Sequence, residues 1–181
     1  VGHHRRDGRR GLRAAEPPEL LHDERAEALA AARFAAYGDS VYPDATFTLR
    51  ISYGQVKGWT ERGRPTPTRT TLGGAFTRAT GADPFKLPTA FVANAKRIDR
   101  SKVYDFVTTN DIIGGNSGSP VIDRAGAVIG AAFDGNIHSL GGNYGYEAAL
   151  NRTVVVSTDA IQEALEKIYP APALVAELKA R

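Results

Sequence analysis

The 181-residue sequence contains no cysteine and no methionine. Without cysteine there is no disulfide framework, no thiolate metal site and no cysteine nucleophile, and the redox compartment is not indicated. No apolar run approaches the roughly 18 residues of a membrane-spanning helix, since the longest, residues 127–133, is only as long as a strand. We therefore expect no membrane span. Because methionine is missing even at position 1, we expect a processed product, a frame opened at a valine codon or, as we favour, a fragment.

Positive charge is concentrated at the amino terminus. Five arginines against one aspartate give residues 1–13 a net charge of +4, whereas the whole chain carries +3. Such a segment could contact nucleic acid or an anionic membrane, but it lacks aromatic residues and is interrupted by glycine. We therefore predict a disordered basic tail over residues 1–22 and no nucleic-acid partner. His3 and His4 lie in this tail without a third ligand at a fixed spacing, so no metal site is predicted.

After the tail, the pattern of residues predicts one helix followed by strands. Asp23 can cap an alanine-rich helix over residues 23–38 that ends at Gly38, which we interpret as the terminal helix of a preceding helical domain. Apolar and polar residues then alternate over residues 45–53, as in a half-buried strand. Residues 55–59 are predicted to form the returning strand, and residues 62–69 a polar loop with proline.

The remainder is predicted to be an antiparallel β body with a helix at its end. A short helix is expected near residues 87–96, and strands over 102–108, 121–122, 127–133 and 153–156, with a turn at 123–126. Asp159 with Gln162 resembles a capping box, so a helix is expected over residues 159–169 until Pro170, followed by a short helical tail. The fold class is mainly β, and residues 39–181 form one lobe.

One segment carries a pattern typical of catalysis. Residues 114–120 read Gly-Gly-Asn-Ser-Gly-Ser-Pro. A serine nucleophile needs a tight turn with small neighbours, where backbone N–H groups converge on the developing oxyanion. Ser117 is the candidate nucleophile, with the N–H groups of Gly115 and Ser117 as donors; the alternative is an ordinary glycine-rich hairpin loop. The α/β-hydrolase elbow is excluded, because the last position is Ser119 and Pro120 leads into a strand.

This turn and its flanking motifs resemble a known family. The turn is similar to that of chymotrypsin-fold serine peptidases, and residues 42–50, 53–54, 109–112, 133–136, 140–142 and 151–152 resemble the carboxy-terminal part of bacterial dipeptidyl-peptidases 7 and 11, family 46 of clan PA. The resemblance covers roughly residues 24–180. It implies a chymotrypsin-like β-barrel lobe and removal of dipeptides from free peptide N-termini. Ile113 departs from the threonine usual in the family.

The resemblance also implies roles for residues beyond Ser117. Asp134 matches the residue that anchors the α-ammonium group of the substrate, and its alternative is a turn aspartate. Gly135 matches a pocket position that is arginine in members preferring acidic residues, so glycine implies a hydrophobic penultimate residue. Asn136 joins this substrate-binding set. Asp111, six residues before Ser117, lies where trypsin-like enzymes select basic residues, but the family has aspartate there without that preference.

Two further expectations concern activation and the triad. Asn116 replaces the aspartate that pairs with a freed N-terminus in trypsin-like zymogens, so activation by trimming is not expected. The mechanism needs a histidine base and an aspartate that orients it. In the family both come from an N-terminal barrel that this chain lacks. His22 lacks the expected strand context, and His138 could line the cleft or face water, so neither completes a triad.

We therefore expect a dipeptidyl-peptidase lobe that carries the nucleophile and is inactive alone, with an exposed apolar half-interface. The alternative is a non-catalytic module that binds peptide N-termini. The expected partners are peptides with a free N-terminus, the missing N-terminal barrel and helical domain, and in the full-length enzyme a possible homodimer. The family resemblance implies a periplasmic or cell-envelope location, and no metal or organic cofactor is expected.

Overall fold

The computed structural model describes residues 18–38, 49–142 and 145–180, which fall in two compact units divided between Thr48 and Leu49. The first unit contains helix α1 (Pro18–Tyr37), followed by Gly38 at a φ of +55°. The helix is present where the sequence predicts it, but it begins at Pro18, because proline is well tolerated in a first helical turn. The predicted disordered tail over residues 1–22 is therefore wrong for residues 18–22, which belong to α1. Residues 1–17 of that tail, with His3 and His4, and the first part of the predicted strand 45–53 lie outside the described residues.

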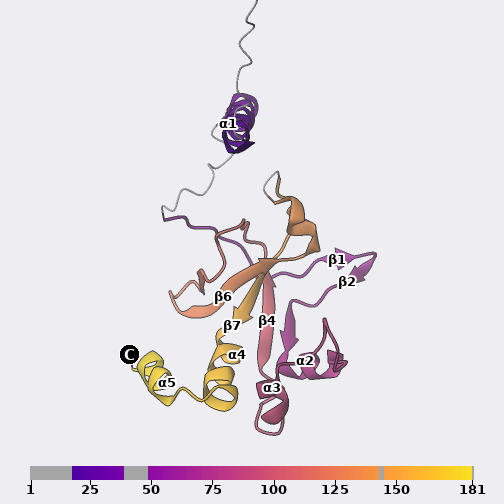
Figure 1. Cartoon of the computed structure of the whole chain (residues 1–181), viewed down its shortest axis with the longest axis vertical. Coiled ribbons are helices and arrows are strands. Elements are labelled where there is room, and N and C mark those ends of the chain that lie inside the picture. The colour runs from indigo at the N-terminus through magenta and orange to yellow at the C-terminus, as the bar shows by residue number, and fades with distance from the viewer. Residues whose placement is uncertain (1–17, 39–48, 143–144, 181) are drawn as a thin grey trace, which may run out of the picture. The chain divides into compact units, whose positions relative to one another are not determined.

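The second unit is built on a five-stranded antiparallel sheet (Figure 1). The strand order is β3 (Arg69–Thr71), β4 (Val103–Thr108), β7 (Thr153–Ser157), β6 (Val128–Gly135) and β5 (Pro120–Ile122). The long central strands β4, β6 and β7 carry most of the pairing. The predicted antiparallel β lobe, with a helix before it and a helix at its end, is confirmed.

Short helices surround the ends of this sheet. They are α2 (Leu72–Arg78), α3 (Thr89–Ala93), the 3₁₀ helix η2 (Ile137–Gly141), α4 (Thr158–Glu163), the π-helical turn η3 (Ala164–Ile168) and α5 (Pro172–Lys179). Leu72, Ile98, Ala160 and Ile168 form one buried cluster that joins α2 to α4 and η3. Burial of such side chains stabilises the fold by about 1.5–3 kcal/mol each. No helix in the described part of the chain has the length and apolar character needed to cross a membrane.

The predicted strand over residues 45–53 is wrong for its described part. Residues 49–53 form no strand, and Leu49, Ile51 and Tyr53 are 93%, 84% and 91% exposed. Alternation specifies a strand only where a neighbouring strand pairs with it, and no described strand does. The returning strand predicted over residues 55–59 is reduced to one isolated bridge, between Val56 and Thr108 of β4.

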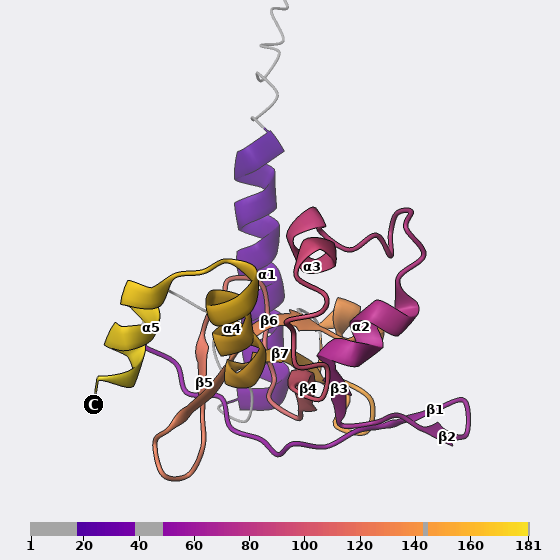
Figure 2. The same ribbon diagram turned by 90° about the horizontal axis from the view of Figure 1, so that it is seen from below.

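Two other local predictions are also corrected. The predicted loop 62–69 instead contains the turn and the second strand of a hairpin formed by β1 (Thr60–Glu61) and β2 (Arg64–Pro65), which extends away from the sheet (Figure 2). Both central residues of its turn, Arg62 and Gly63, have positive φ, as a two-residue hairpin turn requires. The helix predicted to begin at Asp159 is α4, and Ser157 caps it instead, because the Ser157 hydroxyl at the end of β7 accepts the Ala160 N–H.

Candidate active site

The nucleophile turn, residues 113–119, is closed by its own backbone and by one amide side chain. Asn116 Oδ1 accepts the Ile113 N–H at 2.9 Å, and the Asn116 C=O accepts the Ser119 N–H at 3.0 Å. Gly115 and Gly118 have φ values of +95° and +88°, which side-chain-bearing residues rarely adopt. The Asn116 amide therefore has a structural role in the turn, and Ser117 is exposed between the two glycines.

This turn is fixed to strand β6 by main-chain hydrogen bonds. The Gly118 N–H donates to the Ala132 C=O at 2.7 Å, and the Ala132 N–H donates to the Ser119 C=O at 2.9 Å. The Ser117 hydroxyl donates to the Phe133 C=O at 3.3 Å. The candidate nucleophile is thus placed against one residue of β6, sixteen positions later in the sequence.

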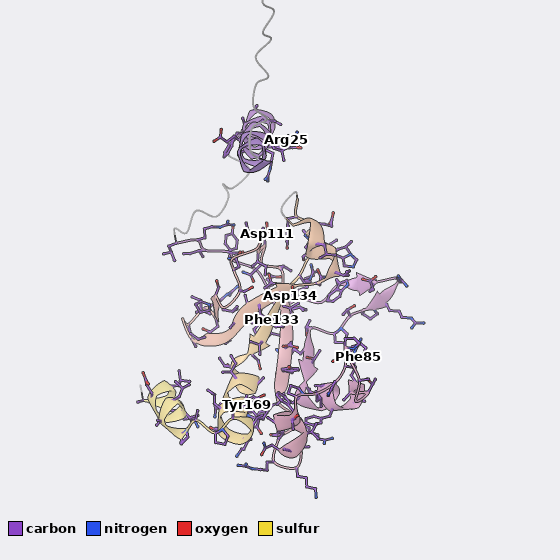
Figure 3. The ribbon with its side chains drawn as sticks, in the orientation of Figure 1. Arg25, Phe85, Asp111, Phe133, Asp134 and Tyr169 are labelled. Carbon is purple, nitrogen blue, oxygen red and sulfur yellow. The ribbon has the colours of Figure 1, made fainter. Side chains whose placement is uncertain are left out.

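An irregularity in β6 makes this placement possible. Ala132 pairs with Val155 on β7 and Asp134 pairs with the adjacent Val154, so Phe133 is an extra residue in the ladder. A bulge of this kind re-aims neighbouring groups. It leaves the Phe133 C=O to accept the Ser117 hydroxyl, and the next residue is Asp134. The bulge therefore brings the candidate nucleophile beside the candidate amine anchor; Figure 3 shows Phe133 and Asp134 together on β6.

Three backbone N–H groups of the turn, those of Gly114, Gly115 and Ser117, make no hydrogen bond within the described protein. Neither the Gly115 N–H nor the Ser117 N–H has an acceptor among residues 49–142 and 145–180, whereas the Asn116, Gly118 and Ser119 N–H groups are all bonded. The N–H groups of Gly115 and Ser117 are the oxyanion donors that the sequence predicts. A Cβ built at Gly115 would meet no atom within 4 Å, so this part of the turn is open.

The three predicted substrate-binding residues lie together in the strand end, residues 134–139. The Asp134 side chain is exposed, and its Oδ1 accepts the Gly135 N–H at 2.8 Å. Gly135 pairs with Thr153 on β7. The side chain of Asn136 is engaged within the protein: Oδ1 accepts the Arg152 N–H at 3.1 Å and the Ser139 hydroxyl at 2.9 Å, and Nδ2 donates to the Leu150 C=O at 2.8 Å. Asn136 thus shapes the strand end.

Arg152 is the residue on which the strand end rests. Its side chain is buried, with 2% of the residue exposed, and it has no carboxylate partner within the described part of the chain. The guanidinium donates only to backbone carbonyl groups, those of Lys57, Gly58, Ala148, Ala149 and Asn151. The Arg152 C=O in turn accepts the Asn136 N–H at 2.8 Å. Sequence reasoning placed Arg152 in a family motif without a role, because its partners come from distant segments.

Asp111 lies in the loop after β4 (Figure 3). Its Oδ2 is buried and has no hydrogen-bond partner in the described part of the chain. Burial raises the pKa of this carboxyl above its ordinary value. Burial thus disfavours the charged form of this carboxyl.

His138 pairs with a carboxylate that the sequence did not single out. Its Nε2 lies 2.6 Å from Glu61 Oε2, which also accepts the Trp59 indole N–H at 3.0 Å. These bonds, His138 first, hold the pKa of the Glu61 carboxyl below its ordinary value. The pair ties the β1–β2 hairpin to η2.

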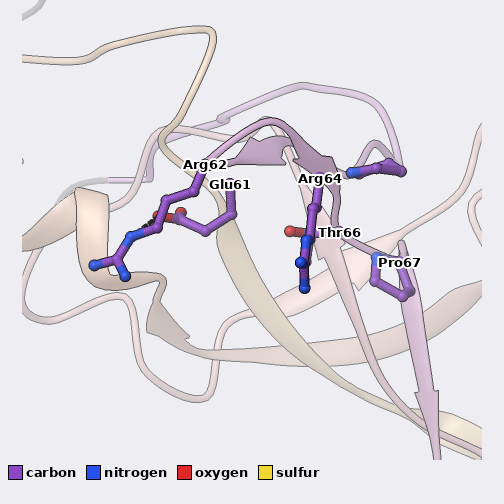
Figure 4. A pocket seen from close by; sticks show the side chains of 6 residues that line it. Glu61, Arg62, Arg64, Thr66 and Pro67 are labelled. Atoms are coloured by element: carbon purple, nitrogen blue, oxygen red, sulfur yellow. Dashed lines mark ion pairs between the residues drawn. The ribbon is translucent and has the colours of Figure 1, made fainter.

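The hairpin also bears a pocket of about 460 Å³ (Figure 4), lined by Glu61, Arg62, Arg64, Pro65, Thr66 and Pro67.

Within residues 49–142 and 145–180 the one histidine, His138, does not contact Ser117. His138 is engaged with Glu61, and His22 lies in α1, in the other unit. Among residues 18–38, 49–142 and 145–180, no group of three carboxylate or imidazole side chains is placed to hold a metal ion. The described site thus combines the exposed hydroxyl of the candidate nucleophile, unbonded backbone N–H groups and an exposed carboxylate.

Comparisons with known proteins identify the family of the chain. The family model of peptidase S46 matches residues 14–180. Dipeptidyl-peptidase 7 of Porphyromonas gingivalis is 36% identical over 154 residues, which are 78% of this chain and 21% of that protein. The Asp/Glu-specific dipeptidyl-peptidase of the same organism is 33% identical over 150 residues, 76% of this chain and 20% of that protein. The chain thus spans about a fifth of the length of these relatives.

A solved structure shares the fold. The crystal structure of Porphyromonas endodontalis DPP11 in complex with the dipeptide Arg-Asp matches with a TM-score of 0.71 and 24% sequence identity. The match covers 89% of this chain and 27% of that chain. The arrangement of the sheet and helices described above is therefore that of the corresponding part of this peptidase.

Proposed function

The chain belongs to the peptidase S46 family, and on that premise we propose that it is the nucleophile-bearing part of a serine-type dipeptidyl-peptidase. The observation that carries the proposal is the contact of the Ser117 hydroxyl with the Phe133 C=O, directly before the exposed carboxylate of Asp134. This contact supports the proposal because the Ser117 hydroxyl lies against the residue that directly precedes Asp134. A peptide held by its α-ammonium group at Asp134 presents a bond near its terminus to Ser117.

In this mechanism the Ser117 oxygen attacks the carbonyl carbon of the second residue of the peptide. The hydroxyl proton passes to a histidine supplied by another part of the enzyme, and the carbonyl oxygen becomes an oxyanion. The N–H groups of Gly115 and Ser117 stabilise that oxyanion, and losing one such donor costs about a hundredfold or more in rate. The proton then moves to the departing amine. Water hydrolyses the dipeptidyl ester and regenerates Ser117.

Gly135 supports a preference for a hydrophobic penultimate residue. It follows the amine anchor directly and adds neither charge nor side chain to the site. We propose that the histidine and aspartate of the triad come from the N-terminal barrel of the enzyme, that the isolated chain is inactive, and that the whole enzyme acts on peptides in the periplasm or cell envelope, with a homodimer possible.

Complementation tests this function. The chain would be mixed with a Porphyromonas gingivalis dipeptidyl-peptidase 7 truncated before the segment that matches this chain. We expect release of dipeptides from peptides with a free N-terminus, none from N-acetylated peptides, none with the chain alone, and loss of release with Ser117→Ala. Asp134→Asn should raise KM strongly, because the charge that anchors the ammonium group is lost. Turnover that survives Ser117→Ala would overturn the proposal.

A second function, a non-catalytic module that binds peptide N-termini, is favoured by the absence of a base beside Ser117 in the described residues. In that case the chain would bind peptides with a free N-terminus equally well with Ser117→Ala. It would show no turnover although the complementing part associates with it. Asp134→Asn would then abolish binding.

A further inference from the structure

The space above Gly135 is already occupied. A Cβ added at this glycine would lie 2.7 Å from the Cβ of Ser139 and 3.3 Å from its Oγ, and an approach of 2.7 Å is closer than real Cβ atoms make. The φ of Gly135 is outside the positive range, so the backbone itself would accept a side chain. Glycine is therefore required at this position by the presence of Ser139.

Ser139 is held in this place by four hydrogen bonds. Its hydroxyl donates to Asn136 Oδ1 at 2.9 Å and to the Arg152 C=O at 3.4 Å. Its N–H donates to the Asn136 C=O at 2.8 Å, and its C=O accepts the Gly142 N–H at 2.9 Å. Both acceptors are themselves fixed, since Arg152 is buried and the Asn136 side chain is bonded to Leu150 and Arg152, in the segment before β7. Ser139 consequently has little freedom to move away from Gly135.

We propose that Ser139 is a specificity-determining residue that acts together with Gly135. Ser139 keeps position 135 without a side chain and forms the wall of the pocket there. A charged or long side chain at position 135 becomes compatible with the fold only when position 139 loses its Cβ. The pocket that receives the penultimate residue therefore changes its charge through two positions, not one. This inference rests on the proposed function only in assigning that pocket to the substrate.

The contact itself is tested by unfolding of the 181-residue chain. Gly135→Ala should lower Tm by about 2–12 °C, because overpacking of this contact destabilises the fold. Ser139→Gly in the same chain should restore most of that loss, and the two effects should be strongly non-additive. Ser139→Ala is the matched control: it removes the hydroxyl bonds but keeps the Cβ, so it should not rescue Gly135→Ala. Additive effects, or an unchanged Tm with Gly135→Ala, would overturn the inference.

Specificity is then tested by titration of the same chain with two dipeptides, Arg-Asp and Ala-Leu. Gly135→Arg with Ser139→Gly should bind Arg-Asp at least about tenfold more tightly than the wild type does, because a buried arginine and carboxylate pair well. Gly135→Arg alone, or with Ser139→Ala, should not. Equal gain in all three variants would contradict a role for Ser139. If even the wild type binds neither dipeptide, the proposed function fails, while the unfolding cycle still decides whether Ser139 excludes a side chain at position 135.

Discussion

The nucleophile turn and the strand end lie side by side, yet different forces hold them. The turn, residues 113–119, takes its shape from main-chain conformations that glycine permits, with a single side-chain amide closing it. The strand end, residues 134–139, takes its shape from side chains that converge from distant segments, above all Arg152. A group that has to face solvent is thus presented by backbone geometry. The strand end, in contrast, is held by side-chain contacts. The two regions should therefore respond differently to substitution.

Removing the support of the strand end should have the largest effect. Arg152→Met keeps much of the aliphatic stem but leaves several buried carbonyl groups without a donor. Because each unsatisfied group costs about 1–3 kcal/mol, we expect a loss of at least about 3 kcal/mol in the free energy of unfolding. Denaturant unfolding of the chain measures it. Arg124→Met, at an exposed turn position, is the control and should change stability by less than about 0.5 kcal/mol.

Straining the backbone of the nucleophile turn should have a smaller effect. Gly118→Ala places a Cβ at a φ of +88° and should cost about 1–2 kcal/mol, although the Cβ would meet no neighbouring atom. Gly114→Ala is the matched control, because Gly114 has no positive φ and open space around it. Equal losses at both glycines would show that the turn is held by packing after all, and the contrast between the regions would disappear.

The single side-chain bond of the nucleophile turn should contribute less again. Asn116→Ala removes the acceptor of the Ile113 N–H and should cost about 1 kcal/mol. Asn116→Asp keeps an acceptor at the same place and should retain most of the stability. Hydrogen exchange of the Ile113 amide reports the bond directly. An unchanged exchange rate in Asn116→Ala would mean that the backbone alone closes the turn.

The smallest effect should come from the half-buried pair of His138 and Glu61, which ties η2 to the β1–β2 hairpin. Hydrogen bonds hold the pKa of Glu61 below 4.5, so its contribution to stability is present above that pH and is lost as the pH falls through the lower folded-state pKa. Glu61→Gln should therefore flatten the acid limb of stability against pH. It should also speed amide exchange at Ser139, which follows His138 in η2.

Glu166→Gln supplies the control for this last experiment. The pKa of Glu166 is lowered by hydrogen bonds from Lys179 and Gln162 at the carboxy-terminal end of the chain. Its replacement should also flatten the acid limb but leave exchange at Ser139 unchanged. If both variants alter Ser139 equally, the tie between His138 and Glu61 does not control η2.

The sequence predicted the turn better than the strand end, for a physical reason. Glycines at special φ values and a serine between them form a contiguous pattern, so Ser117, Gly115 and the role of a tight turn follow from residues 114–120. The helix that ends at Gly38 and the turn over residues 123–126 were found in the same way, from local capping and turn residues. Local geometry of this kind is determined by residues that are adjacent in the sequence.

What the sequence did not predict depends on contacts between distant residues. The extra residue Phe133, the bond between Glu61 and His138, and the position of Ser139 over Gly135 arise only when β6, β7 and the hairpin come together. Alternation over residues 45–53 failed in its described part for the converse reason, since a strand needs a partner that the pattern cannot supply. Motifs thus located the candidate chemistry, whereas the shape of the pocket required the fold.

The backbone carbonyl groups around Arg152 also affect which substitutions the surrounding segments tolerate. Within the described residues the guanidinium donates only to main-chain oxygens. Its bonds therefore do not depend on the exposed side chains of Lys57, Ala148 and Ala149. Saturation mutagenesis should find these positions permissive. Gly58 is the exception, since a Cβ there would collide with the Thr66 C=O. One buried cation can in this way hold the strand end in place while the side chains of the segments that enclose it change.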